Sequence, residues 1–338
     1  MEIKKVGVIG CGLMGAGIAQ VAAQAGYETI VRELNDELLE QGLKRISAFL
    51  DKGVVKRKLT QTKRDATWAR VSGTTKMADL ADCDLVIEAI IESLQAKQEL
   101  FRELDSICPQ NTIFASNTSS LSVAEMASAT RRPDRVAGLH FFYPPVINQL
   151  LEVIVPEQAS PEVAEALLTY ARSTGKVAIV AQDSPGFAVN RYFVPWLNEA
   201  ARMLGEGLAS IPGIDEAACE TFRIDMGPFA LMNATGIPIA YHCAESFAPM
   251  LGDFYAPAPP LAARFESGQP WDLEGEEDEA AQAGAKASVG ERLSGVAFGI
   301  AAQLVEEGVA SVEDVERGAM VGLRWPRGPF GMMNDRGV

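Results

Sequence analysis

The fold is decided by one stretch near the start of the chain, Val6-Gly7-Val8-Ile9-Gly10-Cys11-Gly12-Leu13-Met14-Gly15. Its apolar residues predict a buried parallel strand over residues 3–10, and the periodicity that follows predicts a helix over residues 13–25. Gly10 permits a tight turn, Gly12 lets a phosphate approach the backbone, and Gly15 lets the helix pack closely. A glycine loop between a strand and a helix directs phosphates to the helix N-terminus, so the stretch predicts a dinucleotide-binding domain.

An acidic residue follows where such domains bind the adenosine ribose. A strand is predicted over residues 28–31, and Glu33 stands at its end, 18 residues after Gly15. Its carboxylate accepts hydrogen bonds from ribose hydroxyls and repels a 2′-phosphate, which favours NAD over NADP. Arg32 keeps NADP as an alternative cofactor, because an arginine next to the acidic residue can accommodate the 2′-phosphate. The cofactor contacts predicted from this part of the chain are Gly10, Gly12, Leu13, Met14, Gly15 and Glu33.

Further apolar segments extend the sheet. Strands are predicted over residues 85–91, 112–115, 136–141, 150–155 and 176–181. Helical periodicity separates these strands, and strands that alternate with helices are typical of a doubly wound α/β sheet. We therefore expect an NAD-binding Rossmann domain over residues 1–183, ending at the turn signal Asp183-Ser184-Pro185-Gly186-Phe187.

The rest of the chain is predicted to be all-α and contains a tandem repeat. Residues 200–207 resemble residues 301–308, and Gly227-Pro228-Phe229 recurs as Gly328-Pro329-Phe330, each at an offset of 101. We expect a first helical domain over residues 184–270, an acidic solvated linker over 271–292 and a second, incomplete helical repeat over 293–338. The chain either stands alone or belongs to a longer multifunctional protein.

Composition and charge exclude several classes of partner. The 338-residue chain is 48% hydrophobic and carries a formal net charge of −15, which repels nucleic acid and anionic membranes. No apolar run is long enough for a membrane span and no targeting peptide precedes the first strand, so we expect a cytoplasmic protein. The five cysteines form no Cys-x-x-Cys pair and the two histidines stand alone, which argues against disulfides and a metal site.

Polar residues stand where the predicted strands end, and open α/β sheets bind their ligands at that edge. His140 closes a strand before Pro144-Pro145, where imidazole would suit proton transfer; a hydrogen-bonded core histidine is the alternative. The run Ser116-Asn117-Thr118-Ser119-Ser120 supplies more hydrogen-bonding groups than the N-cap of the next helix needs. Lys56-Arg57-Lys58 is the densest basic cluster and would suit further ligand phosphates, unless it is only a solvated helical face.

Together these segments resemble the L-3-hydroxyacyl-CoA dehydrogenase family over essentially the whole chain. The matching segments are residues 10–20, 86–92, 115–121, 138–142 with Pro144, 151–153, and Pro185-Gly186-Phe187 with Val189-Asn190-Arg191. In that family a Rossmann domain holds NAD and a helical domain closes over a CoA thioester. The resemblance implies NAD-dependent oxidation of a (3S)-3-hydroxyacyl-CoA to the 3-ketoacyl-CoA, and its reverse, in fatty-acid or related acyl-CoA degradation.

The resemblance also implies roles for individual residues. It makes His140 the general base for the hydroxyl proton and Glu152 the carboxylate that orients it. Ser119 and Asn190 would hydrogen-bond the substrate oxygens. Glu33, Glu92, Lys97 and Ser119 correspond to cofactor contacts, and Lys56 and Ser119 correspond to contacts with CoA.

The chain departs from the family pattern at three places. Tyr143 stands where the family usually has an asparagine near the nicotinamide, which leaves the cofactor contacts and the substrate shape open there. Gln269-Pro270-Trp271 replaces a Gly- and Lys-rich loop, so the lysine contact of that loop is not carried over. The tandem helical unit resembles longer members, in which a second copy supplies the packing that short members obtain by dimerising. We therefore expect either a monomer or a homodimer.

Three other functions stay open on sequence alone. A dehydrogenase of a free hydroxy acid or sugar acid would need an arginine clamp for the carboxylate, and we assign none. A dinucleotide-binding protein without catalysis is disfavoured because Ser119, His140, Glu152 and Asn190 are all present. A Ser-His hydrolase that uses Ser119 or Ser120 lacks a nucleophile elbow.

Overall fold

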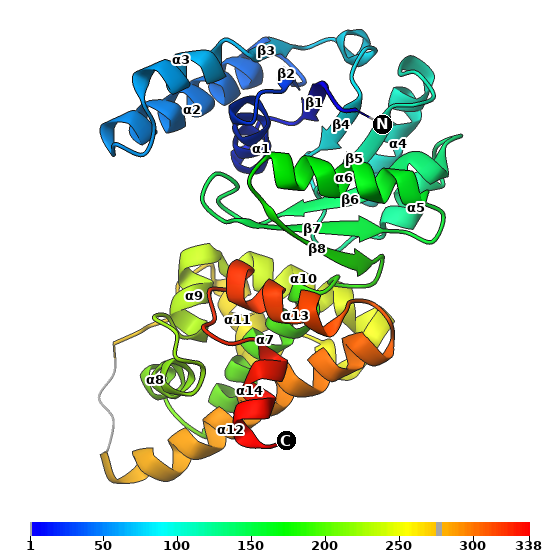
Figure 1. Ribbon diagram of the computed structural model, residues 1–338. Coiled ribbons are helices and arrows are strands. Elements are labelled where there is room, and N and C mark those ends of the chain that lie inside the picture. The colour runs from blue at the N-terminus through cyan, green and yellow to red at the C-terminus, as the bar shows by residue number, and fades with distance from the viewer. Residues whose placement is uncertain (1, 275–278) are drawn as a thin grey trace. The chain divides into compact units, whose positions relative to one another are not determined.

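The computed structural model describes residues 2–274 and 279–338, and the chain divides into two compact units, Met1–Asp183 and Ser184–Val338 (Figure 1). The acidic residues 275–278, which the sequence assigns to a linker, lie outside the described residues. Within the described ranges, no helix is both long and apolar enough to cross a membrane.

The first unit is built on one eight-stranded sheet with the order β3-β2-β1-β4-β5-β6-β7-β8. The strands are β1 (Lys5–Ile9), β2 (Glu28–Arg32), β3 (Val71–Thr74), β4 (Leu85–Glu88), β5 (Ile113–Ser116), β6 (Val136–Phe141), β7 (Leu150–Val155) and β8 (Val177–Gln182). The neighbours from β3 to β6 are parallel. Strand order reverses between β1 and β4, the switch point at which such sheets bind dinucleotides, and the predicted doubly wound α/β fold is confirmed.

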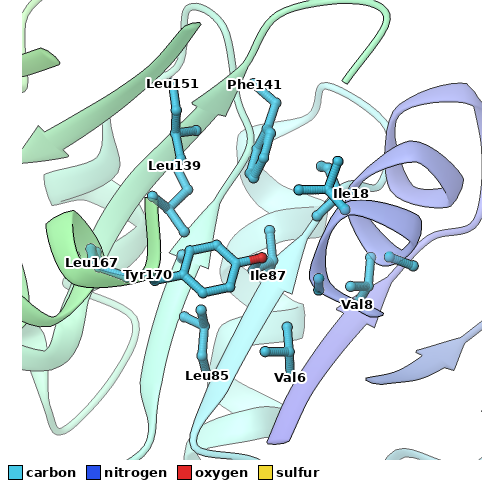
Figure 2. Close-up of a cluster of buried hydrophobic side chains, with 14 of the residues drawn as sticks. Val6, Val8, Ile18, Leu85, Ile87, Leu139, Phe141, Leu151, Leu167 and Tyr170 are labelled. Atoms are coloured by element: carbon cyan, nitrogen blue, oxygen red, sulfur yellow. The ribbon is translucent and has the colours of Figure 1, made fainter. Parts of the chain in front are cut away.

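Helices cover both faces of this sheet. They are α1 (Leu13–Gln24), α2 (Asp36–Val55), α3 (Gln61–Trp68), η1 (Met77–Leu80), α4 (Leu94–Ile107), α5 (Val123–Ala127), η2 (Pro133–Arg135) and α6 (Pro161–Ser173). On one face Ile18 of α1 and Leu167 and Tyr170 of α6 pack against apolar side chains of β1, β4, β6 and β7 (Figure 2). On the other face Phe101 of α4 stacks on Phe114 of β5, with ring centroids 5.9 Å apart.

The last two strands run against the others. β6 and β7 pair antiparallel with His140 opposite Glu152, whereas β7 and β8 are parallel to each other. The sequence predicts both strands but not this reversal. The connection over residues 142–149 is too short for the crossover that a parallel pair needs. β3 is not predicted either, because Val71-Ser72-Gly73-Thr74 has one apolar residue and a glycine.

The second unit is all-α, as predicted. Its elements are α7 (Val189–Gly205), α8 (Ile211–Phe222), α9 (Pro228–Thr235), α10 (Ile237–Leu251), η3 (Asp253–Tyr255), α11 (Pro259–Ser267), α12 (Glu279–Glu306), α13 (Val312–Arg317), the π-helical segment η4 (Gly318–Gly322) and α14 (Pro329–Arg336). α12 packs against α7 and α8. Residues 279–292 are expected in the linker, but in the structure they form the first part of α12. Their many alanines favour a helix over a solvated coil.

The two copies of the repeat share their local construction at an offset of 101 residues. Asp215 accepts backbone N–H bonds from the first turn of α9 at 2.8 and 2.9 Å, and Glu316 accepts bonds from the first turn of α14 at 2.6 and 3.1 Å. Ser210 and Ser311 cap the preceding helices α8 and α13. In both copies an acid thus satisfies N–H groups that a helix start leaves without partners.

Among the ion pairs that join the copies, Arg191–Glu307 and Arg292–Glu206 form a reciprocal arrangement. Arg191 of α7 pairs with Glu307, which follows α12, at 2.9 Å. Arg292 of α12 pairs with Glu206, which follows α7. The two arginines, and likewise the two glutamates, are 101 residues apart. Reciprocal contacts of this kind are typical of a two-fold interface, which here lies between two halves of one unit.

Candidate active site

The glycine-rich loop between β1 and α1 has the shape that a phosphate site requires. Gly10 has a φ of 88°, and a Cβ there would lie 2.5 Å from the carbonyl oxygen of Ala89. A Cβ on Gly15 would collide with the Gly10 carbonyl, whereas no atom lies within 4 Å of the Cβ position of Gly12. Gly12 therefore leaves open the space that a pyrophosphate needs beside the N-terminus of α1, and this loop fits the predicted dinucleotide.

Glu33 lies just beyond β2 and reaches the same loop. Its carboxylate accepts backbone N–H bonds from Cys11 at 2.6 Å and from Leu34 at 3.0 Å. Arg45 of α2 donates to the Cys11 carbonyl oxygen at 2.7 Å. Glu33 and Arg45 thus hold the loop from two sides, and the carboxylate keeps further acceptor sites for ribose hydroxyls.

His140 and Glu152 meet at the carboxyl end of β6. His140 Nδ1 lies 2.5 Å from Oε2 of Glu152. His140 is 6% exposed and Glu152 is fully buried, so water screens their interaction little. A carboxylate in hydrogen-bond contact with Nδ1 favours the tautomer that carries its proton on that nitrogen.

Ser119 lies in the loop after β5, and Glu92 holds that loop. Glu92 Oε1 accepts the Thr118 hydroxyl at 2.5 Å and the Ser119 backbone N–H at 3.1 Å. The Thr118 oxygen in turn accepts the backbone N–H groups of Ser120 at 3.4 Å and Leu121 at 3.0 Å. Ser119 itself is half-buried and remains accessible from solvent.

Lys97 of α4 forms an ion pair with Glu92. The Lys97 side chain is 1% exposed, and its ammonium lies 2.6 Å from Glu88 and 3.2 Å from Glu92. Burial alone would raise the pKa of Glu92, but Lys97, the Thr118 hydroxyl and the Ser119 N–H together outweigh it and lower that pKa. The ammonium of Lys97 is taken up by these two carboxylates. A direct contact of Lys97 with the cofactor stays a prediction.

Two further residues hold the end of β6, and the sequence does not single them out for this role. Asn117 Oδ1 accepts the backbone N–H of Phe141, the residue after His140, at 2.9 Å. Lys176, which is 9% exposed, donates to the carbonyl oxygens of Pro145 and, at 2.6 Å, of Asn148. Burial lowers the pKa of Lys176 to about 8. The partners are 24 to 31 residues apart in the sequence, so local patterns carry no signal for them.

The structure distributes the predicted site residues over both units. Glu33, Ser119, His140 and Glu152 lie at one edge of the sheet, and the Asn117–Phe141 bond ties the Ser119 loop to the strand end of His140. Lys56 is exposed at the C-cap of α2, and Arg57 beside it takes a left-handed φ of 56° that closes the turn. Asn190 is the second residue of α7 in the second unit and is half-buried.

Known proteins share both parts of this architecture. Residues 5–184 match the NAD binding domain of 3-hydroxyacyl-CoA dehydrogenase, and residues 186–276 match its C-terminal domain. The chain belongs to the 3-hydroxyacyl-CoA dehydrogenase family. Its cofactor is NAD, and its reaction is the NAD-dependent oxidation of a 3-hydroxyacyl-CoA, as predicted.

Individual members of the 3-hydroxyacyl-CoA dehydrogenase family resemble the chain to different extents. A probable 3-hydroxybutyryl-CoA dehydrogenase of Bacillus subtilis is 40% identical over 269 residues, which cover 79% of this chain and 94% of the relative. The fatty acid oxidation complex subunit alpha of Shewanella frigidimarina is 39% identical over 76% of this chain and 36% of the relative. The crystal structure of 3-hydroxybutyryl-CoA dehydrogenase from Escherichia coli K12 matches 99% of this chain and 92% of its own, at 26% identity and a TM-score of 0.91.

Proposed function

We propose that His140 is the general base of this dehydrogenase and that Glu152 orients it. The observation that carries the proposal is the 2.5 Å contact between His140 Nδ1 and Glu152 Oε2 in a buried cross-strand pair. With Nδ1 bonded to the carboxylate, Nε2 takes the proton of the 3-hydroxyl group, and Glu152 stabilises the imidazolium. When bound, NAD supplies the hydride acceptor. In the reverse direction the imidazolium returns its proton to the ketone oxygen.

The substrate oxygens are bound, in this proposal, by Ser119 and Asn190. The proposed role of Ser119 is supported by the hydrogen bonds that Glu92 and Thr118 make in its loop. Donors that are in place before the reaction stabilise charge on a carbonyl oxygen better than donors that must first reorient. Asn190, which lies in the second unit, is assigned to the substrate by the family resemblance.

Cofactor and CoA binding are assigned by the same combination of geometry and resemblance. The residues proposed to hold NAD are Gly10, Gly12, Leu13, Met14, Gly15, Glu33, Glu92 and Ser119, with Lys97 acting through Glu92. Lys56 is proposed to bind CoA phosphates, supported by its exposure within a basic turn of a chain whose net charge is −15.

We take a short (3S)-3-hydroxyacyl-CoA as the substrate. The support is that the relatives from Bacillus subtilis and Escherichia coli carry the name 3-hydroxybutyryl-CoA dehydrogenase. Tyr143, which is 55% exposed, follows His140 closely in the chain and adds a ring where the family usually has an asparagine. Longer or cyclic acyl groups are the alternative that a substrate panel tests.

We further propose that the chain is a cytoplasmic monomer in which the second repeat takes the place of a partner subunit. The reciprocal pairs Arg191–Glu307 and Arg292–Glu206 support this arrangement, because a two-fold dimer makes contacts of the same kind. A homodimer is the alternative.

Turnover of acetoacetyl-CoA, followed as loss of NADH absorbance, tests the proposed base. Free acetoacetate and NADPH serve as substrate and cofactor controls. We expect turnover with the thioester and NADH, and a loss of at least ~100-fold in His140→Gln, the lower end of what a positioned acid–base group contributes. His242→Gln, which changes a histidine whose side chain is 59% exposed, serves as the matched control. Equal activity of the two variants would refute the assignment of the base.

A further inference from the structure

The segment that leads into Asn190 has an unusual backbone. Gly186 and Phe187 take left-handed φ values of 76° and 51°, and a side chain at Gly186 would lie 2.6 Å from the Phe247 ring. A left-handed aromatic residue is an outlier that persists only where surrounding contacts hold it. The Phe187 N–H donates to the Ser184 carbonyl at 2.8 Å, which closes the turn three residues before Asn190.

Arg191 ties this turn together from inside the second unit. Its side chain is 3% exposed. Its guanidinium donates to the Ser184 hydroxyl at 2.9 Å, and its backbone N–H donates to the Gly186 carbonyl at 3.0 Å. The arginine next to Asn190 therefore bonds two residues of the strained turn, Ser184 and Gly186.

The second repeat supplies the carboxylate that holds this arginine. Glu307 accepts the other guanidinium nitrogen of Arg191 at 2.9 Å, across 116 residues of sequence. A buried guanidinium that loses its carboxylate becomes an uncompensated buried charge, which is destabilising. We therefore expect Arg191 to move towards solvent and to release Ser184.

We propose that Glu307 is a positioning residue for Asn190: it fixes Arg191, and Arg191 fixes the turn that leads into the helix start where Asn190 lies. The proposal rests on the proposed role of Asn190 at the substrate. It gives the second repeat a part in substrate binding that acts through Asn190.

The internal symmetry of the unit provides a control. Arg292 and Glu206 occupy the positions that correspond to Arg191 and Glu307 and also join the two repeats. The residue before Arg292, however, is Glu291 where the first copy has Asn190. Arg292 also pairs with Glu199. Loss of Glu206 therefore breaks a repeat–repeat ion pair without touching the turn before Asn190.

The experiment uses the full chain with Glu307→Ala, Glu307→Gln and Glu206→Ala, each alone and together with Asn190→Ala. The readouts are kcat and KM for acetoacetyl-CoA, the Kd of NADH from its fluorescence, and Tm. We expect Glu307→Ala to lower kcat/KM by ~10-fold or more, because a misplacement of about 1 Å costs on the order of 100-fold. Glu307→Gln, which still accepts a hydrogen bond from Arg191, should recover most of the loss. The Kd of NADH should not change, because the glycine loop is in the other unit.

In Glu206→Ala, kcat/KM should stay within about two-fold of the wild type. In the Asn190→Ala background, Glu307→Ala should add less than about two-fold, because the residue that it positions is gone. Should Glu307→Ala not fold, Glu307→Asp carries the same expectation, because the shorter side chain withdraws the carboxylate from Arg191. Equal losses in Glu307→Ala and Glu206→Ala, or full additivity with Asn190→Ala, would overturn the proposal while leaving the proposed function intact. Absence of wild-type turnover would overturn both.

Discussion

His140 and Glu152 are direct cross-strand neighbours on β6 and β7, and their side chains meet at 2.5 Å without being adjacent in sequence. Glu152→Gln keeps the shape of this pair but removes its charge and allows the wrong imidazole tautomer. We expect kcat to fall by ~100-fold or more while the Kd of NADH stays the same. Steady-state kinetics and NADH fluorescence measure the two effects. Glu157→Gln, at an exposed position after β7, should behave as the wild type. A Glu152→Gln enzyme of normal kcat would show that the carboxylate has no role in orienting the base.

The Cys11 N–H donates to Glu33, so the carboxylate that we propose for the ribose also holds the glycine loop. Glu33→Gln should raise the KM of NADH by about ten-fold, since a hydrogen bond to a charged group contributes about 1.5–3 kcal/mol. The preference for NADH over NADPH should narrow, because a neutral amide does not repel the 2′-phosphate. Initial rates with both cofactors measure this ratio. Glu28→Gln, on the exposed start of the same strand, is the control. An unchanged ratio would contradict the assignment of Glu33 to the ribose.

Most elements of the first unit could be predicted from the sequence because their signals are local. The apolar runs at β6 and β7 predict Val136–Phe141 and Leu150–Val155 with the bounds that the structure shows. The antiparallel direction of β7 depends on the length of the connection, which holds too few residues for a crossover. α12 is mispredicted at its start, since the acidic residues before it suggest a coil while the alanines after Glu279 favour a helix.

The polar residues that organise the site could be predicted only in part. Ser119 and His140 stand at strand ends, where sheet topology directs ligands, and a family resemblance covers them. Asn117, Arg45 and Lys176 could not be assigned their roles, because each role is a bond to the backbone of a segment 24 to 34 residues away. Such a bond follows from the fold and leaves no periodic pattern in the sequence.

Glu92 should give the first unit a stability that disappears in acid. Its folded pKa lies below the ordinary value of 4.5, so its ion pair stabilises the unit above that pH and is lost as the pH falls through the lowered value. Glu92→Gln should therefore lower Tm near neutral pH, at a cost of about 1 kcal/mol because the carboxylate is 40% exposed. The difference in Tm from the wild type should shrink below pH 4.5, and circular dichroism melts measure it. Glu99→Gln, at an exposed position on α4, should show no such trend. A difference that persists in strong acid would exclude the ion pair as its source.

Lys176 should also make the stability of the chain rise with pH, but in an alkaline window. Its pKa is lowered to about 8 in the folded chain from an ordinary 10.5, so between these values the unfolded chain binds the extra proton. The free energy of unfolding of the wild type should therefore rise relative to Lys176→Met as the pH increases through this window, by on the order of 1 kcal/mol. Urea denaturation at pH values from below 8 to above 10.5 measures the change. Lys44→Met, at a side chain that is 72% exposed, should give a flat difference. A flat difference for Lys176→Met as well would mean that the amine titrates as it does in water.

Trp325 anchors the second repeat among the aromatic rings of the first. It is 3% exposed, and its ring centroid lies 4.6 Å from that of Phe222 and 5.7 Å from that of Trp196. Trp325→Ala should cost about 3–5 kcal/mol and lower the calorimetric transition of the second unit, while the first unit keeps its own transition.

The same variant tests whether the second repeat replaces a subunit. Light scattering should give the wild type the monomer mass of 36.2 kDa. In Trp325→Ala the face of α7 that the second repeat covers becomes exposed, so two chains should pair through it and raise the mass. Met320→Ala, at a residue that is 46% exposed in the same repeat, should remain monomeric. A wild type that is already a dimer, and a Trp325→Ala variant of the same mass, would show that the second repeat does not act as the built-in partner.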